Sequence, residues 1–62
     1  MKIEDLNMTE RTTNALILNK VYTTEDLVKL TQEDIAKFHR FGRMSLLELL
    51  DKMKEMHLSF NN

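Results

Sequence analysis

The chain has 62 residues, of which 42% are apolar and 31% charged, with a formal net charge of −1 at pH 7. A chain of this length buries about 60% of the surface that its unfolded form exposes, so it has room for one small core but not for a deep catalytic pocket. It contains no cysteine, which excludes disulfides and thiolate zinc sites.

Metal, membrane and enzymatic functions are also disfavoured by the sequence. The two histidines, His39 and His57, have no second histidine or carboxylate at metal-ligand spacing, and no Ser/His/Asp grouping suggests catalysis. The longest apolar run, Ala15 to Leu18, is far shorter than the ~20 residues that cross a bilayer. We therefore expect a soluble cytoplasmic protein without metal, cofactor or membrane contact.

The first 19 residues predict an arm and a helix. Residues 1–8 are expected to form an extended N-terminal arm, in which Ile3, Leu6 and Met8 are apolar enough to pack on the helices. Thr9 can cap a helix over residues 10–19. Asn19 would end that helix in the left-handed conformation.

Two threonines predict the next helix starts. Thr23-x-x-Asp26 and Thr31-x-x-Asp34 each combine a threonine N-cap with an acid at the third helical position, a variant of the capping box. The helices that follow are expected over residues 24–30 and 32–38. No strand-like alternation appears anywhere.

The longest helix is predicted over residues 43–56. Its apolar residues recur at helical spacing, and they are Leu46, Leu47, Leu49, Leu50, Met53 and Met56. Glu48 and Lys52 form a favourable i,i+4 pair, His57 is expected to close the helix, and residues 61–62 form a tail. The sequence thus predicts an all-α fold, a compact bundle of four to five short helices in a single domain spanning residues 1–62.

The one glycine, Gly42, lies where a turn leads into this last helix. The free N–H groups of Arg43, Met44 and Ser45 would point outward there, with the positive helix end behind them, which suits an anion such as a phosphate. Arg40 and Arg43 add positive charge. A tight structural turn can use a glycine in the same way, so both interpretations remain open at this stage.

Several blocks of the sequence resemble, in order and spacing, the C-terminal domain of the bacterial RNA polymerase alpha subunit. The resemblance covers about residues 3–60 and is carried by Ile3–Leu6, Met8–Arg11, Asn14, Leu16, Thr23–Leu27, Leu30–Asp34, Phe41–Leu46, Glu48 and Leu58–Ser59. It implies a helical domain related to helix-hairpin-helix modules, tethered to other polymerase subunits through an N-terminal domain absent from this sequence. It also implies binding to the minor groove of A/T-rich upstream promoter DNA, contacts with transcription activators and the sigma factor, and a place at the bacterial nucleoid.

The resemblance also implies roles for individual residues. Arg11 and Asn14 match the family's DNA-contacting residues on its first helix, and Gly42, Ser45 and Glu48 match its glycine-serine-glutamate set, with Glu48 expected to orient a cation. The other residues expected at the DNA are Ala15, Arg40, Arg43 and Met44. The acidic positions and the neighbouring threonine expected to contact sigma or activators are Glu4, Asp5, Thr31, Glu33 and Asp34.

Several positions depart from the family pattern. Met44 stands where relatives usually have lysine, and Arg40, where they commonly have asparagine, can replace the missing charge. Ile17 and Leu18 replace a generally polar pair, which places extra apolar surface beside the DNA-binding face or at a partner contact.

Two other classes compete with a noncatalytic DNA-binding and regulator-docking domain. One is a free-standing helical protein-interaction module that binds no DNA. The other is a small enzyme, which the short length and the lack of a catalytic grouping disfavour.

Overall fold

The computed structural model describes residues 1–61. It contains a 3-10 helix, η1 (Ile3–Leu6), followed by four α-helices, which are α1 (Glu10–Leu18), α2 (Thr24–Val28), α3 (Gln32–Ala36) and α4 (Arg43–Glu55). The prediction of an all-α bundle of four to five short helices is confirmed. Each α-helix begins at the predicted residue and ends one or two residues earlier than predicted. Asn62, part of the predicted tail, lies outside the described residues.

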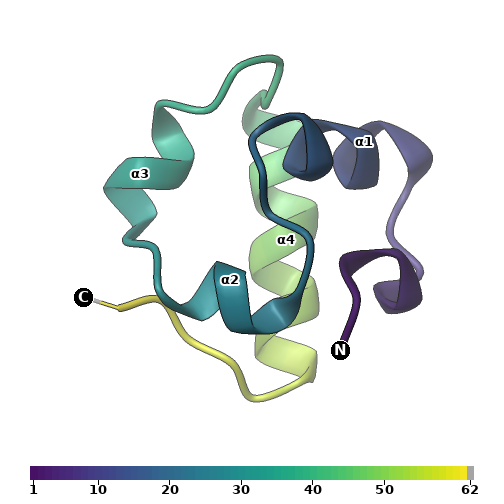
Figure 1. Cartoon of the computed structure of the whole chain (residues 1–62), viewed down its shortest axis with the longest axis vertical. Coiled ribbons are helices and arrows are strands. Elements are labelled where there is room, and N and C mark those ends of the chain that lie inside the picture. Colours follow the sequence, from purple (N-terminus) through teal and green to yellow (C-terminus); the bar gives the residue numbers. More distant parts are fainter. Residues whose placement is uncertain (62) are drawn as a thin grey trace.

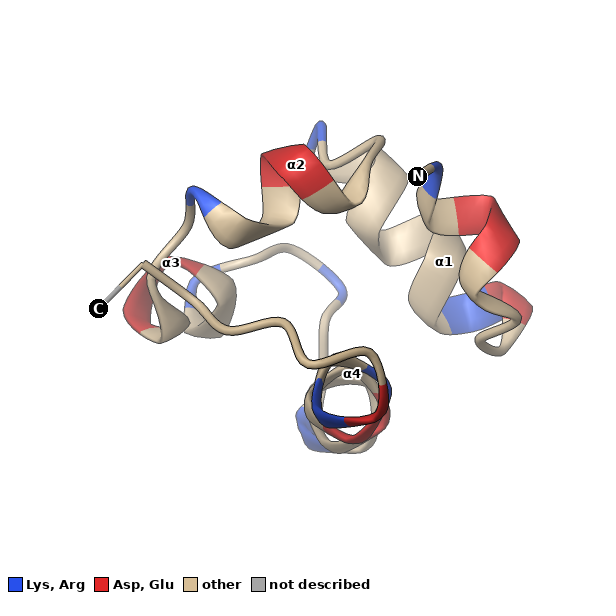
Figure 2. Cartoon of the chain, turned by 90° about the horizontal axis from the view of Figure 1, so that it is seen from below, with Lys and Arg blue, Asp and Glu red and all other residues tan. Residues whose placement is uncertain are grey.

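The helices are arranged around α4. Seen along the axis of α4, the other three α-helices form an arc that faces it from one side (Figure 2). The segment after α4 runs back beside α2 toward α3 (Figure 1), and there the Asn61 N–H donates a hydrogen bond to the Leu30 carbonyl at 2.8 Å. This return closes the side of the bundle opposite α1.

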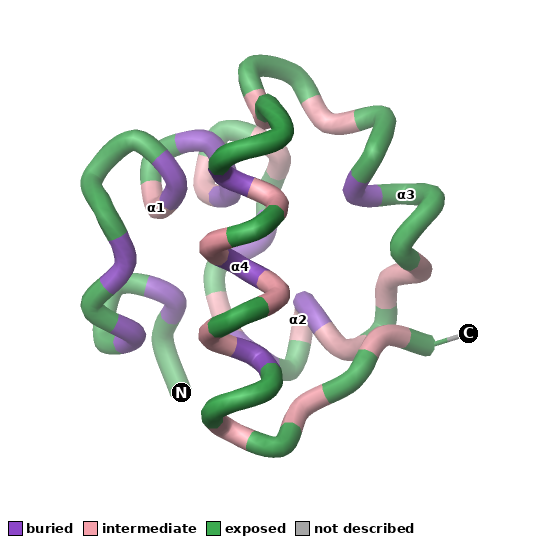
Figure 3. Tube along the Cα trace, turned by 180° about the vertical axis from the view of Figure 1, so that it is seen from behind, coloured by how far each residue is buried: buried purple, intermediate pink, exposed green. Residues whose placement is uncertain are grey.

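The core lies between α4 and the arc. The helices each supply one aliphatic residue that is 0% exposed, and these are Ile3, Leu16, Leu27, Ile35 and Leu49. Figure 3 shows buried positions along α4 and in each of the shorter α-helices. Met53 is buried as predicted, but Leu47, expected on the same apolar face, is half exposed. It lies about 200° around the helix from Leu49, on the side that no other helix covers.

The N-terminal arm differs from the expected extended segment. Residues 3–6 form η1 because a single 3-10 turn places residues i and i+3 on the same side, and Ile3 and Leu6 are both buried. The Ile3 N–H donates to the Tyr22 carbonyl at 3.0 Å, and the Thr24 N–H donates to the Met1 carbonyl at 2.8 Å. The arm is thereby attached to the loop between α1 and α2.

The predicted capping boxes are present on α2 and α3. The Asp26 N–H donates to Thr23 Oγ1 and the Asp34 N–H to Thr31 Oγ1, both at 3.1 Å, and each aspartate accepts the threonine N–H in return. Thr9 precedes α1 as predicted, but the prediction that its hydroxyl caps the helix is wrong. This hydroxyl bonds to α4 instead, as described below.

The end of α1 also differs from the prediction. Asn19 has a φ of −94°, and the left-handed residue is Lys20, with a φ of 67°. The Lys20 N–H donates to the Ile17 carbonyl and the Val21 N–H to the Leu16 carbonyl, both at 2.9 Å, which is a Schellman motif. Asn19 is therefore the residue before the left-handed position and not the left-handed residue itself.

A second Schellman motif ends α4. His57 has a φ of 59°, its N–H donates to the Lys54 carbonyl at 3.2 Å, and the Leu58 N–H donates to the Met53 carbonyl at 2.8 Å. The prediction that His57 closes this helix is confirmed.

Candidate nucleic-acid interface

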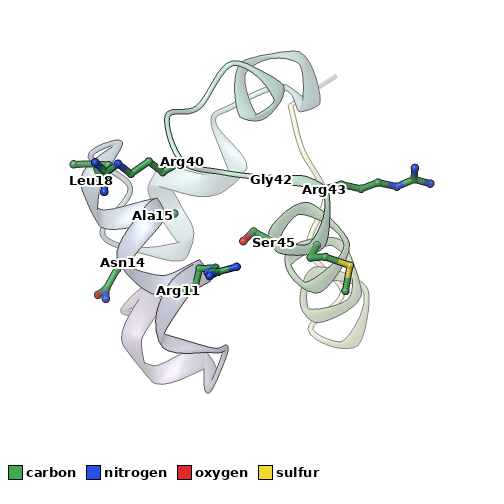
Figure 4. A pocket seen from close by; sticks show the side chains of 9 residues that line it. Arg11, Asn14, Ala15, Leu18, Arg40, Gly42, Arg43 and Ser45 are labelled. Carbon is green, nitrogen blue, oxygen red and sulfur yellow. The ribbon is translucent and has the colours of Figure 1, made fainter.

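An open groove of about 780 Å³ lies between α1 and the segment that leads into α4, and we call it the α1–α4 groove. Figure 4 shows the residues that line it, which are Arg11, Asn14, Ala15, Leu18, Arg40, Gly42, Arg43, Met44 and Ser45. Eight of the nine residues expected at the DNA therefore lie around one groove. The ninth, Glu48, lies outside its lining.

The charge of this groove is entirely positive. Arg11, Arg40 and Arg43 line it, with no carboxylate among the lining residues, and all three arginines are exposed. In Figure 4, Arg11 points from α1 toward α4, whereas Arg43 points away on the far side of α4. The arginines diverge, so they suit an extended anion better than a small one.

The backbone at Gly42 is accessible from the groove. Its φ of −84° and ψ of −178° are those of extended backbone, which any residue adopts. A Cβ added at this position would meet no atom within 4 Å. Neither backbone conformation nor packing within the domain requires a glycine here, so the structural-turn interpretation is not supported. The lack of a Cβ leaves the backbone accessible from the groove.

The start of α4 supplies polar groups to the groove. This helix has no hydrogen bond from a capping residue to its first turn, so the N–H groups there can bind an external anion, assisted by the helix dipole. Ser45 is only 4% exposed, and its hydroxyl points into the groove in Figure 4. The turn, the serine and the uncapped helix end thus lie together at one groove, and their binding of an anion stays a prediction.

Glu48 joins the two walls of the groove at the start of α1. Its carboxylate accepts hydrogen bonds from the Thr9 N–H at 2.8 Å, from Thr9 Oγ1 at 2.8 Å and from Thr12 Oγ1 at 2.5 Å. The bond from the Thr12 hydroxyl, followed by that from the Thr9 N–H, lowers the pKa of Glu48. Its bonded partners are thus threonines and not the cation expected from the sequence.

The predicted pair of Glu48 and Lys52 is also absent as a contact. The ion pair of Lys52 is made with Glu55, at 3.7 Å. Glu48 is drawn toward α1 by its three hydrogen bonds, which leaves Lys52 to the acid on its other side.

Asn19 joins the walls at the other end of α1. Its Nδ2 donates to the Ala15 carbonyl at 2.8 Å and to the His39 carbonyl at 3.0 Å, and its Oδ1 accepts from the His39 N–H at 3.2 Å. The sequence carries no local signal for this contact, because the partner lies 20 residues away.

The apolar pair at the end of α1 is divided between two environments. Ile17 is half-buried. Leu18 is 58% exposed and lines the groove, as does Met44, which is 78% exposed. The extra apolar surface expected from the sequence is therefore present at Leu18 and lies on the groove itself.

Comparison with known sequences identifies the family. Residues 1–55 match the sequence model of the family described as the C-terminal domain of the alpha subunit of bacterial RNA polymerase. The protein belongs to this family.

Relatives of this domain are alpha subunits of DNA-directed RNA polymerase. It is 40% identical over 60 residues to the DNA-directed RNA polymerase subunit alpha of Desulfitobacterium hafniense, a match that covers 97% of the domain and 19% of the relative. The identities to the alpha subunits of Bacteroides fragilis and Chlorobaculum tepidum are 39% and 36% over 59 residues, 95% of the domain and 18% of each relative. The domain thus spans less than one fifth of the length of these relatives.

The acidic residues expected to contact other proteins do not form one patch. Glu4 and Asp5 are exposed on η1, whereas Glu33 and Asp34 lie on α3. In Figure 2 the N-terminal segment lies beside α1, at the end of the arc opposite α3. The side chains of Thr31 and Asp34 are bonded to each other's backbone, and the Thr31 N–H lowers the pKa of Asp34. Glu33 is exposed next to this capping box.

Two classes of site are absent from the described part of the domain. Within residues 1–61, no group of three or more His, Cys, Asp or Glu residues could hold a metal ion. No described helix has both the length and the apolar character needed to traverse a bilayer.

Proposed function

We propose that this domain binds the minor groove of A/T-rich DNA upstream of promoters through the α1–α4 groove, as a noncatalytic part of the RNA polymerase alpha subunit in the bacterial cytoplasm. The observation that supports this most is the convergence of Arg11, Asn14, Ser45 and the open backbone at Gly42 on a groove lined by no acid.

Arg11 and Asn14 are suited to the minor groove. They lie three residues apart on α1 and therefore on one face of the helix, where both line the groove. An arginine inserted into the narrow minor groove of an A-tract gains from its enhanced negative potential. Contacts in this groove distinguish chiefly A·T from G·C pairs, so the expected preference is for base composition and not for a defined sequence.

Phosphate contacts would position the domain on the duplex. The uncapped start of α4 offers N–H donors, and Arg40 and Arg43 flank them at the turn. Such contacts fix orientation and carry no sequence information. Few cations are involved, so the affinity should be modest and should fall with salt.

Titration of A/T-rich and G/C-rich duplexes at two salt concentrations tests the proposal. Arg11→Ala should remove most of the binding to A/T-rich DNA. Lys29→Ala is the matched control, because it removes one exposed positive charge from a residue outside the groove. The proposal fails if folded Arg11→Ala binds as well as the parent, or if the parent does not distinguish the two duplexes.

The second candidate function is a helical protein-interaction module without DNA binding. The exposed apolar side chains of Leu18 and Met44 that line the groove favour it, since exposed apolar surface in a groove is typical of interaction sites. The same titration separates the two candidates, because this module would show no binding to either duplex.

We also propose that two acidic surfaces receive proteins of the transcription machinery, sigma at Glu4 and Asp5, and activators at α3. The separation of η1 from α3 in Figure 2 supports two independent contacts. Glu33 is the best residue to mutate on α3, because it can be changed without removing the capping box that Thr31 and Asp34 form.

Transcription in vitro with polymerase carrying Glu33→Lys tests the activator surface. Activation by at least one upstream regulator should fall while binding to A/T-rich DNA is kept. Glu55→Lys provides the control for charge reversal, since Glu55 is exposed at the far end of α4. An unchanged response to every regulator would leave Glu33 as an ordinary solvated acid.

A further inference from the structure

The turn that carries Arg40 is held from both sides. On one side, Asn19 makes a pair of hydrogen bonds with the backbone of His39, donating to its carbonyl at 3.0 Å and accepting from its N–H at 3.2 Å. On the other side, Phe41 packs against the core and meets the ring of Phe38 edge-on, with the centroids 5.9 Å apart. Arg40 itself is exposed between these two attachments.

Arg40 also has an unfavourable backbone. Its φ of 55° lies in the left-handed region, which residues other than glycine, asparagine and aspartate rarely adopt. Such backbone conformations persist only where contacts with the surrounding structure offset their energetic cost. The hydrogen bonds from Asn19 constrain the residue immediately before Arg40, so they help to hold this conformation.

The consequence is a fixed backbone position for the residue that carries this positive charge. In Figure 4, Arg40 extends from the turn toward the end of α1 that carries Leu18, and both residues line the groove. A third hydrogen bond, from Asn19 to the Ala15 carbonyl at 2.8 Å, aligns the asparagine with the helix that forms the opposite wall. Asn19 therefore connects the wall that bears Arg11 to the turn that bears Arg40.

We infer that Asn19 is a positioning residue of the DNA interface, which acts through Arg40 by holding its turn in the binding conformation before DNA arrives. This inference rests on the proposed function of the groove. A turn that is already ordered need not lose its conformational freedom on binding, whereas a released turn must do so. Asn19 does not itself line the groove, so its effect on affinity should depend on the presence of the arginine.

A double-mutant cycle on the affinity for A/T-rich duplex tests this dependence. Asn19→Ala should weaken binding roughly three- to tenfold, the range expected for ordering one turn and its side chain on binding. In the Arg40→Ala background the same substitution should change the affinity less than about twofold, since the group that it positions is gone. Thr23→Ala serves as the control, because it removes a helix cap of α2 and therefore lowers stability at a place away from the groove.

A second measurement covers the case in which Asn19→Ala does not fold. Hydrogen exchange in the parent should show the His39 amide protected by its bond to Asn19 Oδ1, in contrast to the Arg40 amide beside it, for which no such bond is found in residues 1–61. Rapid exchange at His39 overturns the inference without any variant.

The remaining outcomes are separable. A loss of affinity that is equal in both backgrounds, or matched by Thr23→Ala, overturns the inference, because Asn19 would then act only through general stability. Binding that Arg11→Ala abolishes and Asn19→Ala leaves unchanged overturns the inference while the proposed function stands. A parent that binds no DNA overturns both.

Discussion

Replacing Glu48 with glutamine tests the link between α1 and α4 directly. In the parent the carboxylate accepts three hydrogen bonds, two at its Oε1 from the threonine hydroxyls and one at its Oε2 from the Thr9 N–H. The single oxygen of glutamine can keep both hydroxyls, but its NH₂ group would then face the Thr9 N–H, a donor against a donor. One charge-assisted bond is lost and two become neutral.

The size of the effect follows from these bonds. A hydrogen bond to a charged group contributes about 1.5–3 kcal/mol when it is shielded from water. Glu48 is only half-buried, so we expect the free energy of unfolding to fall by about 1–2 kcal/mol. In a domain of 60–100 residues each kcal/mol lowers the melting temperature by roughly 4–8 °C. Thermal unfolding followed by circular dichroism at pH 7 measures this shift.

Glu55→Gln is the control, because it makes the same chemical change on the same helix at an exposed ion pair. Exposed pairs contribute little, and the control should move the melting temperature by a few degrees at most. Equal shifts in Glu48→Gln and Glu55→Gln would refute the reasoning, since the carboxylate would then contribute no more to the α1–α4 contact than a surface charge.

Three other measurements follow from the structure. Met44→Lys should tighten binding to all duplexes about equally and steepen the log–log salt slope by roughly 0.9, as expected for one more neutralised phosphate; an unchanged slope would place this residue away from the DNA backbone. Hydrogen bonds hold the pKa values of Glu48, Asp26 and Asp34 below their ordinary values. These three ionised carboxylates therefore contribute fully to the free energy of unfolding above the ordinary glutamate pKa of 4.5, and this contribution is lost as the pH falls through their folded-state pKa values. The melting temperature should therefore decline on acidification below that pH, and a flat acid profile would contradict it. His57→Gly should stabilise the domain by roughly 0.5 kcal/mol, since relief of the left-handed backbone exceeds the added entropy of the unfolded state, and a lower melting temperature would show that the His57 imidazole matters.

The starts of the helices were predictable because their signals are local. A threonine and an aspartate three residues later satisfy each other's backbone whatever the rest of the sequence does, and both capping boxes formed where expected. The position of Leu47 was not predictable, because its spacing is compatible with the apolar face and only the one-sided arrangement around α4 exposes it.

The residues that line the candidate groove were predictable, but the hydrogen bonds that join its two walls were not. Arg11 and Ser45 came from matching blocks of sequence, and the fold brings them to one groove. The sequence predicts helix-capping roles for Thr9 and Asn19, which are the usual local roles of these residue types. Their actual partners, Glu48 and His39, are 39 and 20 residues away, and contacts at such separations depend on the packing of the whole domain.

The shortness of α2 and α3 has a consequence for genetics. Each has five residues, far fewer than the ~12–15 at which an isolated helix becomes even marginally stable in water. They persist only because Leu27 and Ile35 are enclosed in the common core, so the domain should unfold as one cooperative unit. A core substitution in α3 that unfolds the domain should therefore also remove the α1–α4 groove, so the loss of either proposed contact would not identify which surface had been changed. Only exposed positions such as Glu33 and Arg11 can separate the two surfaces by mutation.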